Sequence, residues 1–218
     1  MAIIFDLDGT LINSLNLHAT SIKKGIDSVI GEGKISYRFI QKNIRYPTSF
    51  LFKLIKDDLD INLSNEQKKL ILENKRRYMS EMDFKGVRLY SGVSNTFNLL
   101  KREKIKFCIA TSMPKRELPL LKSSSKLKII FSVPIFCPDV MEHEKPNPFV
   151  LDMAIEKLHL DRATSFYVGD SITDMEAAKN AGINFIGVFN AKLSDSQLFF
   201  RDMVGLNNFI RKNLAKFK

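Results

Sequence analysis

Short continuous apolar runs, separated by amphipathic stretches, dominate the pattern of hydrophobic and polar positions along the chain. The first run, Ala2–Phe5, ends directly in acidic residues and Gly9, as a buried strand does where it enters a loop. Similar runs cover residues 105–110, 129–136, 165–168 and 184–188. Helical patterns separate most of these runs, and such alternation is typical of a parallel sheet covered by helices. The pattern therefore predicts an α/β fold.

The stretch between the first two runs, residues 15–85, shows several amphipathic helical patterns and no convincing strand. Ser64 precedes Gln67 by three positions, which is the spacing of a helix capping box. Pro47 is expected to open another helix. We therefore expect residues 15–85 to form a helical domain, inserted into a core made of residues 1–14 and 86–218. The apolar pattern of residues 194–218 predicts a helix or helix pair that covers the core.

The composition, with 44% hydrophobic and 27% charged residues, is that of an ordinary globular protein. No stretch approaches the roughly 20 apolar residues of a membrane span. The segment from Met1 to Asp6 lacks the basic region of a signal peptide, so we expect a cytoplasmic protein. Cys108 and Cys137 lie in short apolar runs, and their pattern indicates neither a disulfide framework nor a zinc site.

The net charge of +10 raises the possibility of a nucleic-acid partner. Residues 15–85 carry 14 Lys and Arg against 9 Asp and Glu, and the remainder carries 20 against 15. The excess is thus the same in both parts, and no aromatic-basic motif of a nucleic-acid reader accompanies it. We expect attraction of small anionic phosphates rather than of nucleic acid.

Two pairs of acidic residues follow predicted strands. Asp6 and Asp8 end the first strand, and Asp170 and Asp174 follow the strand at residues 165–168. Ligands of open α/β sheets collect at this edge, and carboxylates that converge there repel unless a cation neutralises them. Either pair alone is more often a helix cap or a turn. Two pairs at strand ends favour a site for Mg²⁺, which prefers oxygen ligands.

Hydroxyl groups and a lysine complete the candidate chemistry. Thr111 and Ser112 follow the run at residues 105–110, where they could hold phosphate oxygens or simply start the next helix at Pro114. Lys145 comes just before a predicted helix, where a solvated surface lysine is the ordinary interpretation. Together with the acids, these residues favour a phosphate site.

The segments Asp6–Thr10, Thr111–Ser112, Lys145–Pro146 and Gly169–Asp174 resemble, in this order, the four motifs of the haloacid dehalogenase (HAD) superfamily. The likeness spans nearly the whole chain. It implies a Rossmann-like three-layer core and a Mg²⁺-dependent hydrolase. The superfamily's dehalogenases lack the second acid of the first motif, so Asp8 favours phosphoryl transfer.

The resemblance also implies roles for individual residues. Asp6 would form an aspartyl-phosphate, while Asp8 would protonate the leaving oxygen and then activate water. Asp6, the backbone carbonyl of Asp8, and Asp170 would bind Mg²⁺, and Asp174 would support the metal through water or orient Lys145. The phosphoryl group would be held by the remaining motif residues, namely Gly9, Thr10, Thr111, Ser112 and Lys145.

The position of the insert resembles the helical cap of the phosphoglycolate-phosphatase and β-phosphoglucomutase branch. Such a cap would select the organic part of a small phosphorylated metabolite. His18 stands where similar sugar-phosphate enzymes often carry a histidine, although an exposed helix histidine is the more ordinary interpretation. Arg45 resembles a residue of the substrate-specificity loop, or is a solvated loop arginine.

Some positions depart from the branch. Ser91-Gly92-Val93 replaces the common Pro-Gly-Val, and residues 187–190 lack a glycine-rich continuation, which weighs against phosphoglycolate itself. The leading hypothesis is hydrolysis of a sugar phosphate, phosphoglycolate or a related monoester. A phosphosugar mutase resembling β-phosphoglucomutase is the alternative, and a receiver-like or non-catalytic phosphate-binding module is a third. The sequence leaves open whether the protein is a monomer or a homodimer.

Overall fold

The computed structural model describes residues 1–46, 48–138, 140, 143–196 and 198–217. It divides into two compact units, a larger one of residues 1–13 and 85–218 and a smaller one of residues 14–84. Each boundary lies one residue before the expected one. The larger unit carries the sheet, and the described part of the smaller unit is helical.

The larger unit is built on a parallel sheet of six strands in the order β3-β2-β1-β4-β5-β6. The strands are β1 (Ala2–Phe5), β2 (Lys106–Ala110), β3 (Ile135–Phe136), β4 (Ser165–Gly169), β5 (Asn184–Val188) and β6 (Leu198–Phe200). Phe5 at the end of β1 pairs with Ile109 of β2 and Val168 of β4. The register therefore brings the carboxyl ends of these three central strands to one edge, as the predicted α/β fold requires.

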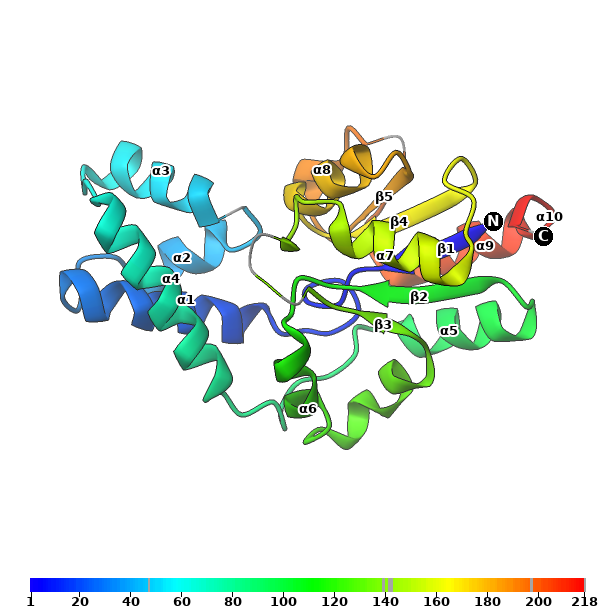
Figure 1. Ribbon diagram of the computed structural model, residues 1–218, viewed down its shortest axis with the longest axis horizontal. Helices are drawn as coiled ribbons and strands as arrows, with labels where there is room; N and C mark the ends of the chain where they lie inside the picture. The colour runs from blue at the N-terminus through cyan, green and yellow to red at the C-terminus, as the bar shows by residue number, and fades with distance from the viewer. Residues whose placement is uncertain (47, 139, 141–142, 197, 218) are drawn as a thin grey trace. The chain divides into compact units, whose positions relative to one another are not determined.

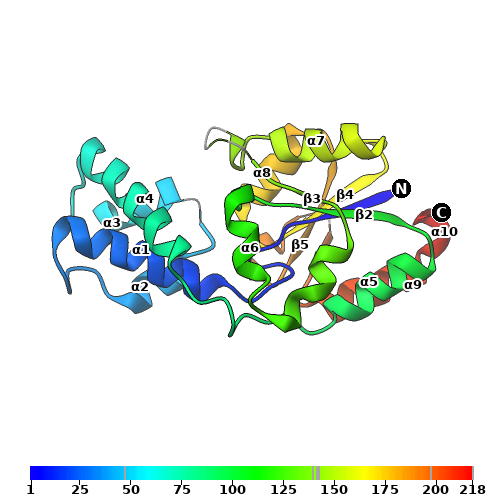
Figure 2. The same cartoon turned by 60° about the horizontal axis from the view of Figure 1, so that its bottom comes forward.

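Helices cover both faces of this sheet. The larger unit contains α5 (Val93–Arg102), α6 (Leu118–Leu121), α7 (Phe149–Leu158), α8 (Ile172–Asn180), α9 (Met203–Lys212) and α10 (Leu214–Phe217). Helices α7 and α8 lie on one face, and α5 and α9 lie on the other (Figures 1 and 2). This is the three-layer, Rossmann-like arrangement implied by the four motifs.

Alternating side chains of the strands supply the two halves of the core. Ile4, Cys108 and Tyr167 face the α7 and α8 side, where they pack among small and aliphatic residues. Phe5 faces the other side, with its ring centroid 5.7 Å from that of Phe97 on α5. Burial of this apolar surface is the main force that holds the helices on the sheet. Both cysteines are free and buried.

The prediction of a strand at residues 129–136 is wrong for most of that range. Residues Ser125–Ser132 form a 3-10 helix, and only Ile135–Phe136 form a strand. Ser124, Leu127 and Ile130 are buried at intervals of three residues, which is the period of a 3-10 helix. A short apolar run does not distinguish this period from that of a buried strand.

The end of the chain also differs from expectation, because residues 194–218 are not helical throughout. Leu198–Phe200 form β6, which pairs with β5 at one edge of the sheet. Helix α9 begins only after Asp202, whose carboxylate accepts the backbone N–H of Gly205 at 2.7 Å. This N-cap stops the helix from extending back into the apolar strand.

The smaller unit consists of α1 (Leu15–Ile30), α2 (Tyr37–Asn43), α3 (Thr48–Leu59) and α4 (Asn65–Ser80). Ser64 and Gln67 form the expected capping box at the start of α4. Helices α1 and α4 pack closely at Gly25, where an added Cβ would lie 2.8 Å from the carbonyl oxygen of Ile71. Pro47, expected to open a helix, lies outside the described residues.

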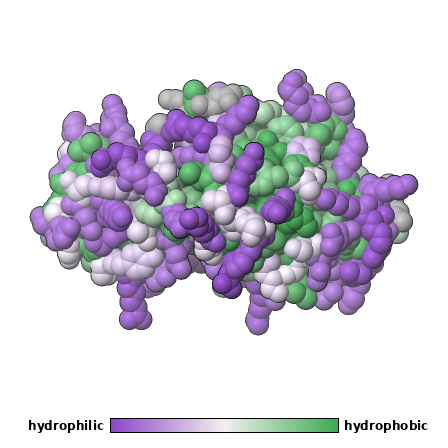
Figure 3. Space-filling view, turned by 90° about the horizontal axis from the view of Figure 1, so that it is seen from below, coloured by the Kyte–Doolittle hydropathy of each residue, from purple (hydrophilic) through white to green (hydrophobic). Residues whose placement is uncertain are grey.

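Figure 3 shows hydrophilic side chains distributed over the displayed face, with apolar residues between them. No described helix is both long enough and apolar enough to cross a membrane.

Candidate functional site

Asp6 lies at the carboxyl edge of the sheet, directly after the last residue of β1. Its backbone N–H donates to the carbonyl of Val168 at 2.8 Å, so the pairing with β4 continues to this residue. The loop that follows is closed by local bonds, including that from the Gly9 N–H to the carbonyl of Ile12 at 2.9 Å. The side chain of Asp6 is buried. The end of the strand therefore fixes the position of this carboxylate.

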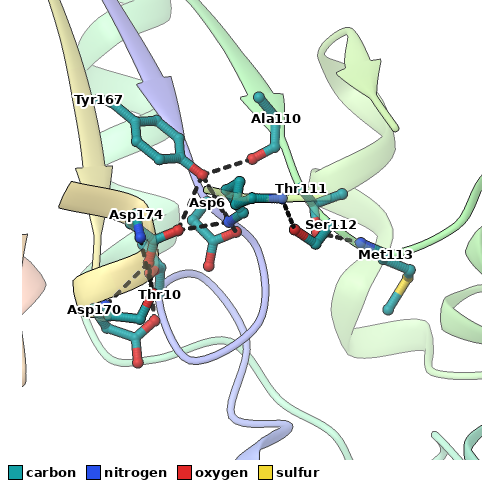
Figure 4. Close-up of polar contacts among 11 residues, drawn as sticks. Asp6, Thr10, Ala110, Thr111, Ser112, Met113, Tyr167, Asp170 and Asp174 are labelled. Carbon is teal, nitrogen blue, oxygen red and sulfur yellow. Dashed lines mark hydrogen bonds and ion pairs between the residues drawn. The ribbon is translucent and has the colours of Figure 1, made fainter. Parts of the chain in front are cut away.

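Three buried carboxylates converge at this edge. Asp6, Asp170 and Asp174 each offer an oxygen atom, and these atoms lie within 4.8 Å of one another (Figure 4). The hydroxyl of Thr10 donates to Oδ1 of Asp170 at 2.9 Å, and the side-chain amide of Asn190 donates to the backbone carbonyl of Asp170 at 2.9 Å. Loops after three different strands thus hold the acidic cluster together.

The two carboxylate oxygens of Asp174 make different contacts. Its Oδ2 accepts the backbone N–H of Ser171 at 3.0 Å and the Ser171 hydroxyl at 2.5 Å, which completes a capping box at the start of α8. Its Oδ1 accepts a bond from Lys145 at 2.5 Å. Asp174 therefore caps α8 and also contacts Lys145.

Lys145 lies within the acidic cluster, and its side chain is 6% exposed. Its Nζ donates to Oδ1 of Asp6 at 2.5 Å, to Oδ1 of Asp174 at 2.5 Å and to the phenol oxygen of Tyr167 at 2.8 Å. One ammonium among three buried carboxylates leaves an excess of negative charge, which is costly in a low-dielectric interior. Carboxylate oxygens in this number fit a hard divalent cation, which would neutralise that excess.

The burial of the cluster shifts its acid–base equilibria. Burial raises the pKa of the Asp6 carboxyl well above its ordinary value; the charge of Lys145 opposes this rise and the charge of Asp174 adds to it. Burial alone would lower the pKa of Lys145, but the charges of Asp174 and Asp6 outweigh that effect and raise it. Lys145 therefore stays protonated and keeps its positive charge beside these two carboxylates.

The two hydroxyl residues after β2 make different contacts. Thr111 is buried, and its Oγ1 accepts the backbone N–H of Met113 at 3.0 Å. The Oγ of Ser112 accepts the backbone N–H of Lys145 at 3.1 Å. Accepting a bond does not use the hydroxyl hydrogen, so each group can still donate to an anion. Ser112 also ties the segment that carries Lys145 to the end of β2.

The remaining residues of the first motif differ in their surroundings. Asp8 is half-buried, and its carboxylate is not part of the three-acid cluster found among the described residues. Gly9 has a φ of +82°, and a Cβ there would lie 2.5 Å from Oδ2 of Asp170. Only glycine allows this backbone conformation and this approach without strain. The hydroxyl of Thr10 is directed to Asp170 rather than left open for a phosphate.

His18 and Arg45 belong to the smaller unit. His18 lies on α1, and Arg45 follows α2. Their contact with a substrate remains a prediction.

Sequence reasoning missed Tyr167 and Asn190. Tyr167 was expected only as part of an apolar strand, yet its phenol oxygen lies in the acidic cluster (Figure 4). Its signal in the sequence is a side chain with a polar end, three residues before Asp170 and at the sheet edge where the acids collect. Asn190 follows β5, so it too comes after a strand end.

Several known proteins resemble this chain over most of its length. Residues 3–188 match the family model described as haloacid dehalogenase-like hydrolase. A phosphorylated carbohydrates phosphatase of Thermotoga maritima is 29% identical over 187 residues, covering 85% of this chain and 83% of that protein. A phosphoglycolate phosphatase of Photobacterium profundum is 27% identical over 191 residues, covering 85% and 82%.

Solved structures share the fold. A hydrolase from Pseudomonas syringae superposes with a TM-score of 0.76 at 22% identity, covering 97% of this chain and 98% of that one. A HAD hydrolase of family IA from Entamoeba histolytica gives a TM-score of 0.72 at 24% identity, covering 99% and 98%. The family match spans all four motifs, from the strand before Asp6 to the strand after Asp174. The chain belongs to the haloacid dehalogenase-like hydrolase family.

Proposed function

We propose that the protein is a magnesium-dependent phosphatase that hydrolyses a small phosphate monoester through an aspartyl-phosphate on Asp6. The observation that carries the proposal is the buried contact of Asp6 with Lys145, within a cluster of three carboxylates. A nucleophile, a fixed cation and a cluster of oxygen ligands together suit phosphoryl transfer.

The contacts of Asp6 support its role as the nucleophile. Its Oδ1 accepts a bond from Lys145 and lies 3.5 Å from the phenol oxygen of Tyr167. Both of these contacts are made by Oδ1, so in this proposal Oδ2 is the oxygen that attacks the phosphorus atom. Attack by Oδ2 forms an O–P bond and breaks the bond between phosphorus and the ester oxygen.

Asp8 is the candidate for moving the proton. It is half-buried and two residues from the nucleophile, so it can reach both the leaving group and water. In the first stage its carboxyl group donates a proton to the ester oxygen that leaves. In the second stage its carboxylate takes a proton from the water that attacks phosphorus, the bond from Asp6 to phosphorus breaks, and inorganic phosphate leaves.

Asp6, Asp170, Asp174 and the backbone carbonyl of Asp8 would hold Mg²⁺. When bound, the ion supplies positive charge that offsets the carboxylates and the phosphoryl oxygens. The chain's own groups add to this. Lys145 holds one oxygen of Asp6 in place, and the hydroxyls of Thr111 and Ser112 can donate to phosphoryl oxygens.

Two relatives support the proposed class of substrate, because their names are phosphorylated carbohydrates phosphatase and phosphoglycolate phosphatase. A small phosphorylated metabolite is therefore the proposed substrate. In this proposal, residues 14–84 form a cap, and His18 and Arg45 contact the organic part of that metabolite.

The test is a release assay for inorganic phosphate with phosphorylated sugars and phosphoglycolate, with Mg²⁺ or with excess chelator. We expect release that requires Mg²⁺. Asp6→Asn removes the nucleophile with almost no change of shape, so we expect kcat to fall by at least about a thousandfold. The matched control is Asp195→Asn, at an exposed position of the same unit, which should retain full turnover.

Circular dichroism and thermal unfolding establish that both variants are folded. Comparable turnover in Asp6→Asn and the wild type would contradict the mechanism. Formation of a sugar phosphate isomer without release of phosphate would contradict hydrolysis and favour a mutase.

A further inference from the structure

We propose that Tyr167 is a positioning residue, whose phenol holds the ammonium of Lys145 against Asp6. The part of the inference that concerns turnover rests on the proposed phosphatase function. The part that concerns the position of Lys145 rests on the geometry of the larger unit alone.

The phenol oxygen of Tyr167 joins three segments of the chain. It accepts a bond from Nζ of Lys145 at 2.8 Å and donates to the backbone carbonyl of Ala110 at 2.9 Å. Its distances to Oδ1 of Asp174 and Oδ1 of Asp6, at 3.3 and 3.5 Å, are longer. The single phenol hydrogen therefore goes to Ala110, and the lone pairs face Lys145.

The sheet fixes the position of Tyr167 itself. Its side chain is fully buried, and in the strand register Tyr167 is the partner of Ile4, two residues before Asp6. Residues two apart on a strand face the same side of the sheet. Tyr167 and Asp6 therefore meet on one face, and the bond to Ala110 ties the phenol to the strand that ends just before Thr111.

The ammonium of Lys145 has three N–H donors, and the three contacts use all of them. Two acceptors are the carboxylates of Asp6 and Asp174, which already belong to the acidic cluster. The third is neutral, so it fixes the direction of the ammonium without adding negative charge to that cluster. A lysine side chain has a long flexible stem, and a fixed third acceptor restricts its rotation.

Loss of the phenol oxygen would leave one buried N–H of Lys145 and the carbonyl of Ala110 without this partner. Buried polar groups that lose a partner move to find another or remain unsatisfied. We expect the ammonium to shift, and with it the oxygen of Asp6 that it holds. Tyr167 thus acts on the reaction through Lys145 and does not itself contact the reacting atoms.

Tyr167→Phe removes the oxygen and keeps the buried ring. We expect kcat to fall about tenfold, as expected for the loss of one hydrogen bond to a charged group. The matched control is Tyr37→Phe in the smaller unit, where the phenol donates to the carbonyl of Asn16 at 3.4 Å, and it should keep wild-type turnover. Tyr167→Met serves the same purpose if the phenylalanine variant does not fold.

A double-mutant cycle separates positioning from a general structural effect. In a Lys145→Met background, Tyr167→Phe should reduce kcat by less than about twofold, because the lysine through which it acts is absent. Equal losses in both backgrounds would overturn the proposal.

A second readout needs no enzymatic activity. Metal-free protein is treated with an amine-acylating reagent, and the rate at Lys145 is compared with that at exposed Lys106 by peptide mass spectrometry. In the wild type, Lys145 should be strongly protected by its burial and its three bonds. We expect its rate to rise about tenfold in Tyr167→Phe and to stay constant in Tyr37→Phe.

Unchanged protection of Lys145 in folded Tyr167→Phe would overturn this inference, even if Asp6→Asn abolishes turnover as proposed. If the wild type released no phosphate from any substrate, the proposed function would fail, and the acylation rates would still decide the role of Tyr167.

Discussion

The two units of the molecule differ in the reach of their buried polar side chains. In the smaller unit, Ser21 and Asn43 bond within their own helices, Ser21 to the carbonyl of His18 at 2.9 Å and Asn43 to that of Phe39 at 3.0 Å. In the larger unit some buried polar side chains also bond locally, but others join distant segments. Lys145 and Asp6 are 139 residues apart in the chain, and Thr10 and Asp170 are 160 residues apart.

This difference indicates where the protein accepts a loss of stability in order to place charged groups together. A hydroxyl that bonds its own helix is satisfied locally and leaves the apolar packing of the bundle intact. Buried carboxylates that face one lysine are an expensive arrangement, and apolar residues of the same volume are often at least as stable. In the proposed function, the cost of such a cluster in the larger unit is offset by its use at the active site.

The largest effect is expected when one aspartate in each unit is replaced by asparagine. Asp170→Asn removes one carboxylate of the cluster, and we expect kcat/KM at a fixed Mg²⁺ concentration to fall at least about a hundredfold. Asp58→Asn, at an exposed position of α3, should leave it unchanged. Kinetic titration with Mg²⁺ and calorimetry measure the effect. If Asp170→Asn bound the metal with normal affinity, the acidic cluster would not be the metal site.

A smaller effect is expected from alanine substitutions at two glycines. These glycines have similar φ values but different surroundings. Gly9 and Gly33 have φ values of +82° and +79°, so alanine at either should cost about 1–2 kcal/mol of unfolding free energy. At Gly9 the new Cβ would also lie 2.5 Å from Asp170, whereas at Gly33 no atom lies within 4 Å. We expect turnover to fall about tenfold or more only in Gly9→Ala.

Urea unfolding measures the cost of backbone strain at each glycine, and steady-state kinetics on the same preparations measure the effect of displacing Asp170. Equal turnover in the two glycine variants would show that the close approach of Gly9 has no role in the site.

The smallest effect concerns stability in the smaller unit. In Gly25→Ala the added methyl group would lie 2.8 Å from the backbone of α4, a contact that a side-chain rotation cannot relieve. Overpacking costs about 1–3 kcal/mol, and the better helix propensity of alanine returns about 1 kcal/mol. We expect urea unfolding to show a net loss of about 1 kcal/mol, and full turnover.

The control for this variant is Gly86→Ala, an exposed position with no atom within 4 Å of the new Cβ. It should be neutral or slightly stabilising. A stabilised Gly25→Ala would mean that α1 and α4 have room to separate.

Local patterns in the sequence predicted a large part of the fold. Continuous apolar runs identified the central strands, and the spacing of Ser64 and Gln67 identified the start of α4. The pattern failed at the margins of the sheet. Residues 129–132 form a 3-10 helix, and residues 198–200 form an edge strand. Short apolar runs suit several conformations, and only pairing with a neighbouring strand selects one of them.

The sequence by itself determined which residues reach the carboxyl edge of the sheet, because strand ends and helix starts are local features. It therefore indicated Asp6, Lys145, Asp170 and Asp174 before any contact was known. Only the tertiary structure decided which oxygen each group contacts and that Tyr167 is the third acceptor of Lys145. The physical reason is that these contacts join residues 22 to 160 positions apart, whose distances depend on strand order and register rather than on any local pattern.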